Sequence, residues 1–213
     1  MVIAVIADIV GSRRLQDRAA AQQQLDDTIA RVEERHPLAL QPLRPTVGDE
    51  QQGVYARLED ALVSLLLVQL ALPEGVEFRF GVGIGEVRSV SSAHRELSDG
   101  TAWYAARDAI ESVQERQRGM PGIRTWIVGA PGQDEVMPSA IAVYNAYLLL
   151  RDDIVTQMNA RARRLTLGRL EGLSQQDLAA QEQITQPSVS KALRGSGANA
   201  LIAGIEQLRG TRA

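Results

Sequence analysis

The distribution of apolar residues predicts strands that are buried to different degrees. Residues 2–7 form an uninterrupted apolar run that ends at Asp8, which is typical of a central strand covered on both faces. Residues 44–55 predict two short strands joined at residues 48–50, where Gly48 permits a tight turn. The chain therefore begins as part of a sheet.

Glycine marks a further strand. Residues 76–80 alternate as a strand and run into a segment with glycine at every second position, at Gly81, Gly83 and Gly85. Glycine leaves one face of this strand almost bare, so a ligand or another backbone can approach it closely. A bulged or tightly packed strand accounts for the same glycines. A mostly polar loop is expected over residues 89–94.

Helical spacing of apolar residues and helix-ending prolines predict helices between the strands. The expected elements are helices over residues 18–34, 61–72, from 101 onward, 140–153 and 154–169, a strand over 123–129, and a linker at 134–139. The order β-α-β-β-α-β-loop-α-β predicts an α+β fold with a ferredoxin-like, mostly antiparallel sheet covered by helices. The apolar helical segments are too short to span a bilayer, so no membrane contact is expected.

The last part of the chain carries a second helical pattern. Ser174 is placed to cap a helix over residues 175–183, and Thr185 to cap a second helix that extends to Arg194. A final amphipathic helix over residues 198–208 would dimerise or close a small all-α domain. The predicted regions are a main domain at 1–135, a helical linker or dimerisation region at 136–168, and a C-terminal domain at 169–213.

Composition and charge narrow the classes of function. The chain has no cysteine, which excludes a disulfide frame and thiolate chemistry, and its one lysine, Lys191, excludes a Walker A loop. The net charge of −3 divides into −7 for residues 1–155 and +4, eight Lys/Arg minus four Asp/Glu, from Thr156 onward. A basic tail suits nucleic acid. The N-terminus lacks the basic segment of a signal peptide, so a cytoplasmic protein is expected.

Carboxylates at the ends of two predicted strands form a candidate metal site. If the first strand and the hairpin at 44–55 are neighbours, Asp8 and Asp49 converge at one edge of the sheet. Hard oxygen ligands of this kind suit Mg²⁺ or Mn²⁺, which usually carry the phosphates of a substrate. A turn that merely favours glycine and aspartate also explains residues 48–50.

A candidate phosphate site follows the first strand. Ile9, Val10, Gly11 and Ser12 form a predicted strand-to-helix turn, and amide groups at such a helix start favour phosphate. Arg13 would add a charge-assisted contact. An ordinary capped helix gives the same local sequence.

Four segments of the main domain, in this order, resemble motifs of the class III nucleotidyl cyclase catalytic domain. They are residues 7–12 for the first metal motif, 46–50 for the second, 80–87 for the glycine-rich strand and 105–107 for the end of an Asn-x-x-x-Arg helix. The resemblance implies a cyclase-type sheet over about residues 2–128. The pattern Gly-Asp-Glu-x-Gln followed by Asp-Gly…Ala-Arg is more closely similar to the SatD family, whose biochemical role is poorly defined.

This resemblance implies roles for individual residues. Asp8 and Asp49 would hold Mg²⁺ or Mn²⁺ ions that bind the triphosphate of ATP or GTP, and Arg107 would steady the transition-state charge. The asparagine of the cyclase motif corresponds to Trp103, which can stack on a base but cannot orient a ribose as an amide does. The purine-reading lysine corresponds to Pro45. These departures favour binding of a purine nucleotide over its efficient cyclisation.

The C-terminal pattern Q-x-x-L-A-x-x-x-Q-I-x-x-P-S-V-S over residues 175–190 resembles the helix-turn-helix of bacterial transcription regulators. Small Ala179 would let the two helices cross closely, and Gln183 stands where glycine is usual because φ is often positive there. The resemblance implies that the second helix enters the major groove of double-stranded DNA. The residues expected at DNA are Thr185, Gln186, Ser188, Ser190, Lys191 and Arg194. A three-helix protein-interaction module is the alternative.

These features predict a homodimeric, DNA-binding transcription regulator whose cyclase-like domain senses a purine nucleotide with Mg²⁺. The alternative is an active nucleotidyl cyclase or related nucleotide-processing enzyme whose tail only localises it. A third possibility is a relic cyclase fold that serves only for dimerisation.

Overall fold

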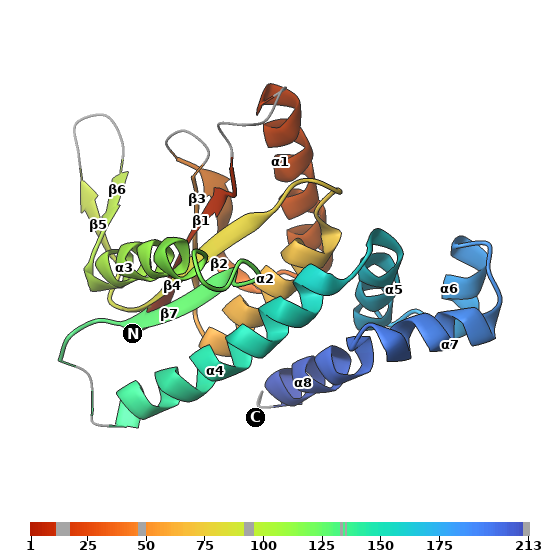
Figure 1. Ribbon diagram of the computed structural model, residues 1–213. Coiled ribbons are helices and arrows are strands. Elements are labelled where there is room, and N and C mark those ends of the chain that lie inside the picture. The colour runs from red at the N-terminus through yellow and green to blue at the C-terminus, as the bar shows by residue number, and fades with distance from the viewer. Residues whose placement is uncertain (12–17, 47–49, 92–95, 133, 135, 211–213) are drawn as a thin grey trace.

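A five-stranded sheet with β1 (Val2–Ile9) at its centre organises the first two-thirds of the chain (Figure 1). The computed structural model describes residues 1–11, 18–46, 50–91, 96–132, 134 and 136–210. The strand order is β2-β3-β1-β4-β7, with β2 (Ala39–Pro45), β3 (Gln51–Tyr55), β4 (Phe78–Gly85) and β7 (Thr125–Gly129). Only the β4–β7 pair is parallel. The predicted α+β fold with a mostly antiparallel sheet is confirmed.

Helices cover both faces of the sheet, and the side chains of β1 point alternately to one face and to the other. Ile3, Val5 and Ile9 point into a core shared with α1 (Arg18–Arg35) and α2 (Leu58–Ala71). Ala4 and Ile6 point to the opposite face, where α3 (Thr101–Arg116) packs. Burial on both faces explains why this strand is a continuous apolar run rather than an alternating one.

The glycines of β4 receive the backbone of α3. A Cβ added at Gly83 would lie 2.0 Å from the carbonyl oxygen of Ala102, and one at Gly81 would lie 2.2 Å from that of Ala106. Only glycine allows a helix to lie this close to a strand. Of the two occupants considered for this bare face, the structure has the backbone of a helix rather than a ligand.

The prediction of a polar loop over residues 89–94 is wrong for residues 89–91. The segment instead contributes to a second, two-stranded sheet, in which β5 (Arg88–Ser91) pairs antiparallel with β6 (Glu96–Asp99). Residues 92–95 lie outside the described part. A two-stranded ribbon can be held by backbone hydrogen bonds alone, so its sequence need not show the apolar alternation by which strands are recognised.

The boundaries of the following helices also differ from the expectation. Most of the expected linker and the first expected helix form one helix, α4 (Val136–Gln157), and the break comes at Met158 and Asn159 rather than after residue 153. The side chain of Asn159 accepts a hydrogen bond from the amide of Ala162 at 2.9 Å and caps α5 (Ala160–Leu170). The capping residue therefore fixes the break.

Two side chains of α4 occupy the free edge of β7. Asn145 accepts a hydrogen bond from the amide of Ile127 at 2.9 Å and donates one to its carbonyl oxygen at 3.0 Å. Two helical turns later, Asp152 accepts from the amides of Arg124 and Thr125 at 2.7 and 2.6 Å. These contacts satisfy backbone groups that an open sheet edge would leave unpaired.

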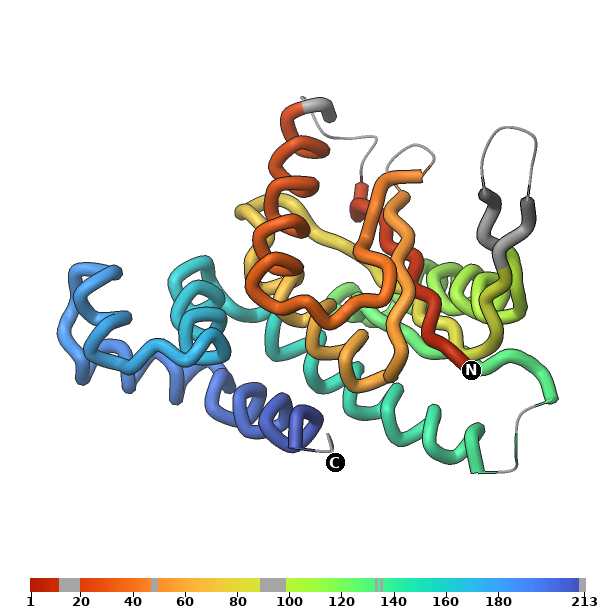
Figure 2. The backbone as a smooth tube through the Cα atoms, turned by 180° about the vertical axis from the view of Figure 1, so that it is seen from behind, coloured from red at the N-terminus to blue at the C-terminus, as the bar shows by residue number. Residues whose placement is uncertain are grey.

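Three more helices complete the chain: α6 (Gln175–Gln181), α7 (Gln186–Gly195) and α8 (Ala198–Gly210). One continuous apolar cluster runs from the sheet through α2 and α5 to Leu201 and Ile205 of α8. Both views place α6 and α7 at one end of the molecule, beyond α5 as seen from the sheet (Figure 2). The two predicted domain boundaries, after residues 135 and 168, remain a prediction. Among the described residues, no helix combines the length and apolar character that crossing a bilayer requires.

Candidate functional site

Asp8 at the end of β1 forms a two-point ion pair with Arg79 of β4. The two residues are direct partners in the strand register, and Arg79 donates from Nε to Oδ1 and from Nη2 to Oδ2, both at 2.8 Å. Their side chains are only 13% and 27% exposed for Arg79 and Asp8. This paired geometry holds both groups in fixed positions at the sheet edge. Arg79 was not among the predicted site residues, although it is the one charged residue of an apolar strand.

A second carboxylate–arginine pair stands close by. Arg107 of α3 donates to both carboxylate oxygens of Glu50 at 2.7 and 2.9 Å, which ties α3 to the start of β3. The hydrogen bond to Glu50 raises the pKa of Arg107, partial burial opposes this, and the charges of Glu50, Glu111 and Asp8 raise it further. Asp8 alternates onto the same face of β1 as Ala4 and Ile6, the face that α3 covers, so both ion pairs lie on the α3 side of the sheet. We call Asp8, Glu50, Arg79 and Arg107 the edge cluster.

The strand arrangement agrees with the premise of the predicted metal site. β1 and β3 are neighbours, and Ala7 pairs with Gln51. Asp49 stands two positions before Gln51 but lies outside the described residues, as do Ser12 and Arg13. The predicted meeting of Asp8 and Asp49 therefore stays a prediction.

The described part of the predicted phosphate turn has its own contacts. Ile9 is buried in the core at 1% exposure. The amide of Val10 donates to the carbonyl oxygen of Glu77 at 2.8 Å. Gly11 is exposed and has a positive φ of 69°. Of these three residues, Gly11 is the one whose surroundings are open.

Trp103 stands one helical turn before Arg107 on α3. Its half-buried indole packs beside Ala4, Ile6 and Ala106 in the small core between α3 and the sheet. The indole therefore has a structural role on its inner side. The predicted role of Trp103 in stacking on a base stays a prediction.

The donor atoms of the edge cluster fit a divalent cation only in part. Within the described ranges, no group of three or more His, Cys, Asp or Glu side chains is placed to hold a metal ion. Asp8 and Glu50 supply hard oxygen atoms of the kind that Mg²⁺ and Mn²⁺ prefer. Each carboxylate is, however, bound to an arginine. A metal ion at this position would have to displace an arginine or recruit further donors.

The six predicted DNA-binding residues lie together on α7 and its cap. Thr185 caps the helix, and its Oγ1 accepts from the amide of Ser188 at 3.4 Å. Val189 and Leu193 face inward and are buried. All six predicted residues are at least partly exposed: Thr185, Gln186, Ser188, Ser190, Lys191 and Arg194.

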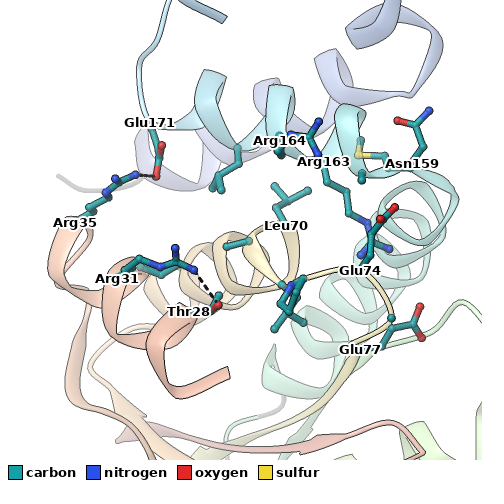
Figure 3. Close-up of a pocket in the computed structure, with 18 residues that line it drawn as sticks. Thr28, Arg31, Arg35, Leu70, Glu74, Glu77, Asn159, Arg163, Arg164 and Glu171 are labelled. Atoms are coloured by element: carbon teal, nitrogen blue, oxygen red, sulfur yellow. Dashed lines mark hydrogen bonds and ion pairs between the residues drawn. The ribbon is translucent and has the colours of Figure 1, made fainter. Parts of the chain in front are cut away.

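A cavity of about 510 Å³ lies away from the edge cluster, where α1, the loop after α2 and α5 meet (Figure 3). Arg35 closes one side by pairing with Glu171 at 2.8 Å. Arg31 donates to Thr28 at 3.1 Å. The Nε of Arg163 is buried and has no hydrogen-bond partner among the described residues. This cavity lies between the sheet-bearing part of the chain and α5. Both arginines and glutamates line it, the latter including Glu74 and Glu77, so its charge is mixed.

Comparison with solved structures finds cyclase domains over about half of this chain. A bacterial light-regulated adenylyl cyclase has a TM-score of 0.42 and 10% identity, over 54% of this chain and 70% of its own. The guanylyl cyclase domain of the RhoGC fusion protein from Blastocladiella emersonii has a TM-score of 0.41 and 16% identity, over 52% and 73%. An adenylate cyclase of Trypanosoma brucei has a TM-score of 0.41 and 15% identity, over 53% and 68%.

No curated protein matches the sequence. A family match covers nearly the whole chain, from residue 2 to residue 205, and so includes the edge cluster as well as α6 and α7. The chain belongs to the SatD family.

Proposed function

We propose that this protein is a DNA-binding transcription regulator whose edge cluster binds a purine nucleotide together with Mg²⁺. The observation that carries the DNA-binding half is α7, an exposed polar helix whose only charged residues are Lys191 and Arg194. The nucleotide-binding half of the proposal rests on the edge cluster.

The connection between α6 and α7 supports a helix-turn-helix. Ser174 and Asp177 form a reciprocal capping box at the start of α6. Gln183 has a φ of 54°, the left-handed turn conformation in which glycine is usual. The amide of Ile184 then donates to the carbonyl oxygen of Ala179 at 3.0 Å, which closes the turn. The chain thus bends where a recognition helix would have to begin.

The chemistry of α7 suits the major groove. Gln186 and Ser188 lie at the N-terminal end of the helix, where side chains of a recognition helix reach base edges. Lys191 and Arg194 lie further along and suit phosphates, which set register and affinity rather than sequence. The acidic side chain nearest in sequence, Glu182, is bound by Arg164 at 2.6 and 2.7 Å and so is not free to repel DNA.

Selection of bound sequences from random duplex DNA, followed by anisotropy titration, tests this half. The wild-type chain should enrich a defined sequence. Arg194→Ala should weaken binding to all sequences and reduce the slope of log K against log salt by about one, because one phosphate contact is lost. Arg118→Ala, an exposed arginine on the sheet side, is the matched control and should change neither quantity. Absence of any enriched sequence would favour a protein-interaction module.

The edge cluster suits a metal–nucleotide complex by exchange of partners. Two arginines and two carboxylates already neutralise one another there. An incoming Mg²⁺–triphosphate would let Arg79 and Arg107 turn to phosphate oxygens while Asp8, with Asp49, turns to the metal ion. Trp103 would lie near the base. Arg107 would then leave Glu50, whose side chain is 19% exposed, so such binding is favourable only if the metal ion or its water also takes up this carboxylate.

Calorimetric titration with ATP and GTP in Mg²⁺ tests the sensor. Saturable binding that is lost in Asp8→Asn and Asp49→Asn, with intact nucleotide recovered afterwards, is the expected result. For regulation, the nucleotide must bind one arrangement of the protein better than another and so change its DNA affinity. Tight binding that leaves DNA affinity unchanged would contradict the regulatory part of the proposal.

The second candidate is a nucleotide-processing enzyme. The position of Arg107 on α3 favours this function. The charge of Asp8 contributes there to the raised pKa of Arg107. Formation of a product from ATP or GTP with Mn²⁺, abolished in Asp49→Asn, would establish this function in place of a sensor.

A further inference from the structure

One face of α4 carries large apolar side chains in contact with solvent. Val136, Val143 and Leu150 are 72%, 71% and 69% exposed. They follow one another at intervals of seven residues, which is close to two helical turns, so they form a straight stripe along the helix. Asn145, Leu148, Asp152 and Val155 lie on the opposite, buried side.

The surroundings of this stripe are also apolar. No charged residue occurs from position 136 to position 150, although much of this segment is exposed. Small Ala142 and Ala146 lead from the stripe to a groove of about 680 Å³ between α4 and β7. Trp126, Ile141 and Leu149 line that groove. Together they make an apolar surface of the kind that marks an interaction site.

The chain itself covers the adjoining side of α4. A Cβ added at Gly197, at the start of α8, would lie 3.0 Å from the Cγ2 of Ile154. A Cβ added at Gly204 of α8 would likewise lie 3.7 Å from the ring of Tyr147. The C-terminal helices therefore cover the side of α4 that carries Tyr147 and Ile154 and leave the adjoining stripe of Val136, Val143 and Leu150 exposed.

We propose that this surface is the contact between two copies of the chain, with α4 packed antiparallel against its counterpart and Val143 at the twofold axis. In this register Val143 meets Val143 of the partner subunit, and Val136 meets Leu150 of the partner subunit. The stripe is symmetric about Val143, as a twofold contact requires.

Charge favours the antiparallel arrangement over a parallel one. Asp153 lies three residues beyond Leu150 and is exposed. In a parallel pair with seven-residue periodicity, the two copies of Asp153 would meet in the seam, where like charges repel. In the antiparallel pair, Asp153 lies instead just beyond the N-terminal end of the partner helix, because Leu150 meets Val136 there. The positive end of the helix dipole there favours a carboxylate.

The size of the surface suits a dimer only if the groove is included. A helix of 22 residues is about 33 Å long and roughly 10 Å wide, so one helix face offers about 330 Å² in projection. Stable interfaces bury about 800 Å² on each partner. The walls of the groove around Trp126 and Leu149 would supply much of the difference.

Sedimentation of the full chain at micromolar concentration is the first test, and its outcome does not depend on any DNA or nucleotide. The wild-type chain should be a dimer. Val143→Glu places two carboxylates at the axis and should raise the dimer Kd at least about 100-fold. Leu40→Glu is the matched control, because Leu40 is 60% exposed on the edge strand β2, and should leave the dimer intact. A monomeric wild-type chain, or a dimer unchanged by Val143→Glu, would overturn the proposal.

Cysteine cross-linking then tests the register in a chain that has no native cysteine. Under mild oxidation, Val143→Cys should form a covalent dimer. Val136→Cys and Leu150→Cys should each fail alone, because the two copies of either residue would lie about 20 Å apart. An equimolar mixture of the two variants should cross-link. Cross-linking of either variant with itself would mean that the helices are parallel.

Discussion

Asp8 and Arg79 face each other across β1 and β4 and share two hydrogen bonds of 2.8 Å. This pair places a fixed positive charge beside the carboxylate that the sequence marks as a metal ligand. A site built in this way is neutral before any ligand arrives. If the site takes the proposed ligands, we expect nucleotide and metal ion to bind together, because either alone would leave one of the two charges without a partner.

Loss of this pair should lower stability measurably. In Asp8→Asn, the largely buried guanidinium of Arg79 loses its counter-charge but keeps one acceptor, so we expect the free energy of unfolding to fall by about 1–3 kcal/mol. Urea unfolding measures the change. Arg88→Ala is the control, because it breaks the pair with Glu86 whose side chains are both well exposed, and should leave the free energy of unfolding nearly unchanged. Equal effects would mean that the Asp8–Arg79 pair contributes no more than a surface pair.

The close approach of α3 to β4 should make Gly83 intolerant of any side chain. The Cβ of Gly83→Ala would lie 2.0 Å from the carbonyl oxygen of Ala102 and 2.4 Å from the amide nitrogen of Ala106. Both are backbone atoms, so the helix itself must move, and we expect a loss of about 3 kcal/mol or more. Gly119→Ala should be nearly neutral, because nothing lies within 4 Å of that position. Thermal unfolding of the two variants side by side tests the difference.

Strands and helices with a clear apolar pattern could be predicted from the sequence. The side chains that pair between these elements could not. The run at residues 2–7 indicated a buried strand, and β1 is buried on both faces. The pairing of Asp8 with Arg79 joins residues 71 positions apart, and that of Glu50 with Arg107 joins residues 57 apart. Such contacts depend on the strand order, which local periodicity does not contain. Of the four residues of the edge cluster, the sequence therefore indicated Asp8 and Arg107 as candidates, but neither Glu50 nor Arg79.

The errors have local causes as well. The sequence predicted a helix end at residue 153, yet Asp152 accepts hydrogen bonds from amides at the edge of β7 and the helix continues to Gln157. From sequence alone, a charged residue within a helix is expected to be exposed, because a buried partner cannot be recognised without the structure. The open stripe around Val143 gave no separate signal, since its spacing also fits a buried face.

The link between α5 and α6 should weaken at acidic pH. Hydrogen bonds from Arg164, opposed by partial burial, together with the charges of Arg164 and Arg161 hold the pKa of Glu182 below its usual 4.5. A carboxyl group whose folded-state pKa is lowered stabilises the fold fully above its unfolded pKa, and this contribution is lost as the pH falls through the folded-state pKa. Hydrogen exchange of α6 should thus accelerate below about pH 4.5.

Glu182→Gln provides the control for this acid effect. It should make α6 exchange faster at neutral pH and should remove the part of the pH dependence that Glu182 causes. An unchanged acid response in this variant would assign the effect to other carboxyl groups, for example Asp177 in the capping box, whose pKa is also lowered by its bonds to Ser174.

Neighbouring aspartates of α4 should differ sharply in their importance. Asp152 is fully buried, accepts two amide hydrogen bonds from the edge of β7, and balances the buried Arg151 at 2.7 Å. In Asp152→Ala the guanidinium of Arg151 stays buried without its counter-charge and the β7 amides lose their acceptor, so we expect a loss of about 3–5 kcal/mol. Asp153→Ala removes an exposed carboxylate bonded only to Gln157 and should change stability by less than about 0.5 kcal/mol. Urea unfolding of both variants decides between them: comparable losses would show that the free edge of β7 does not depend on α4.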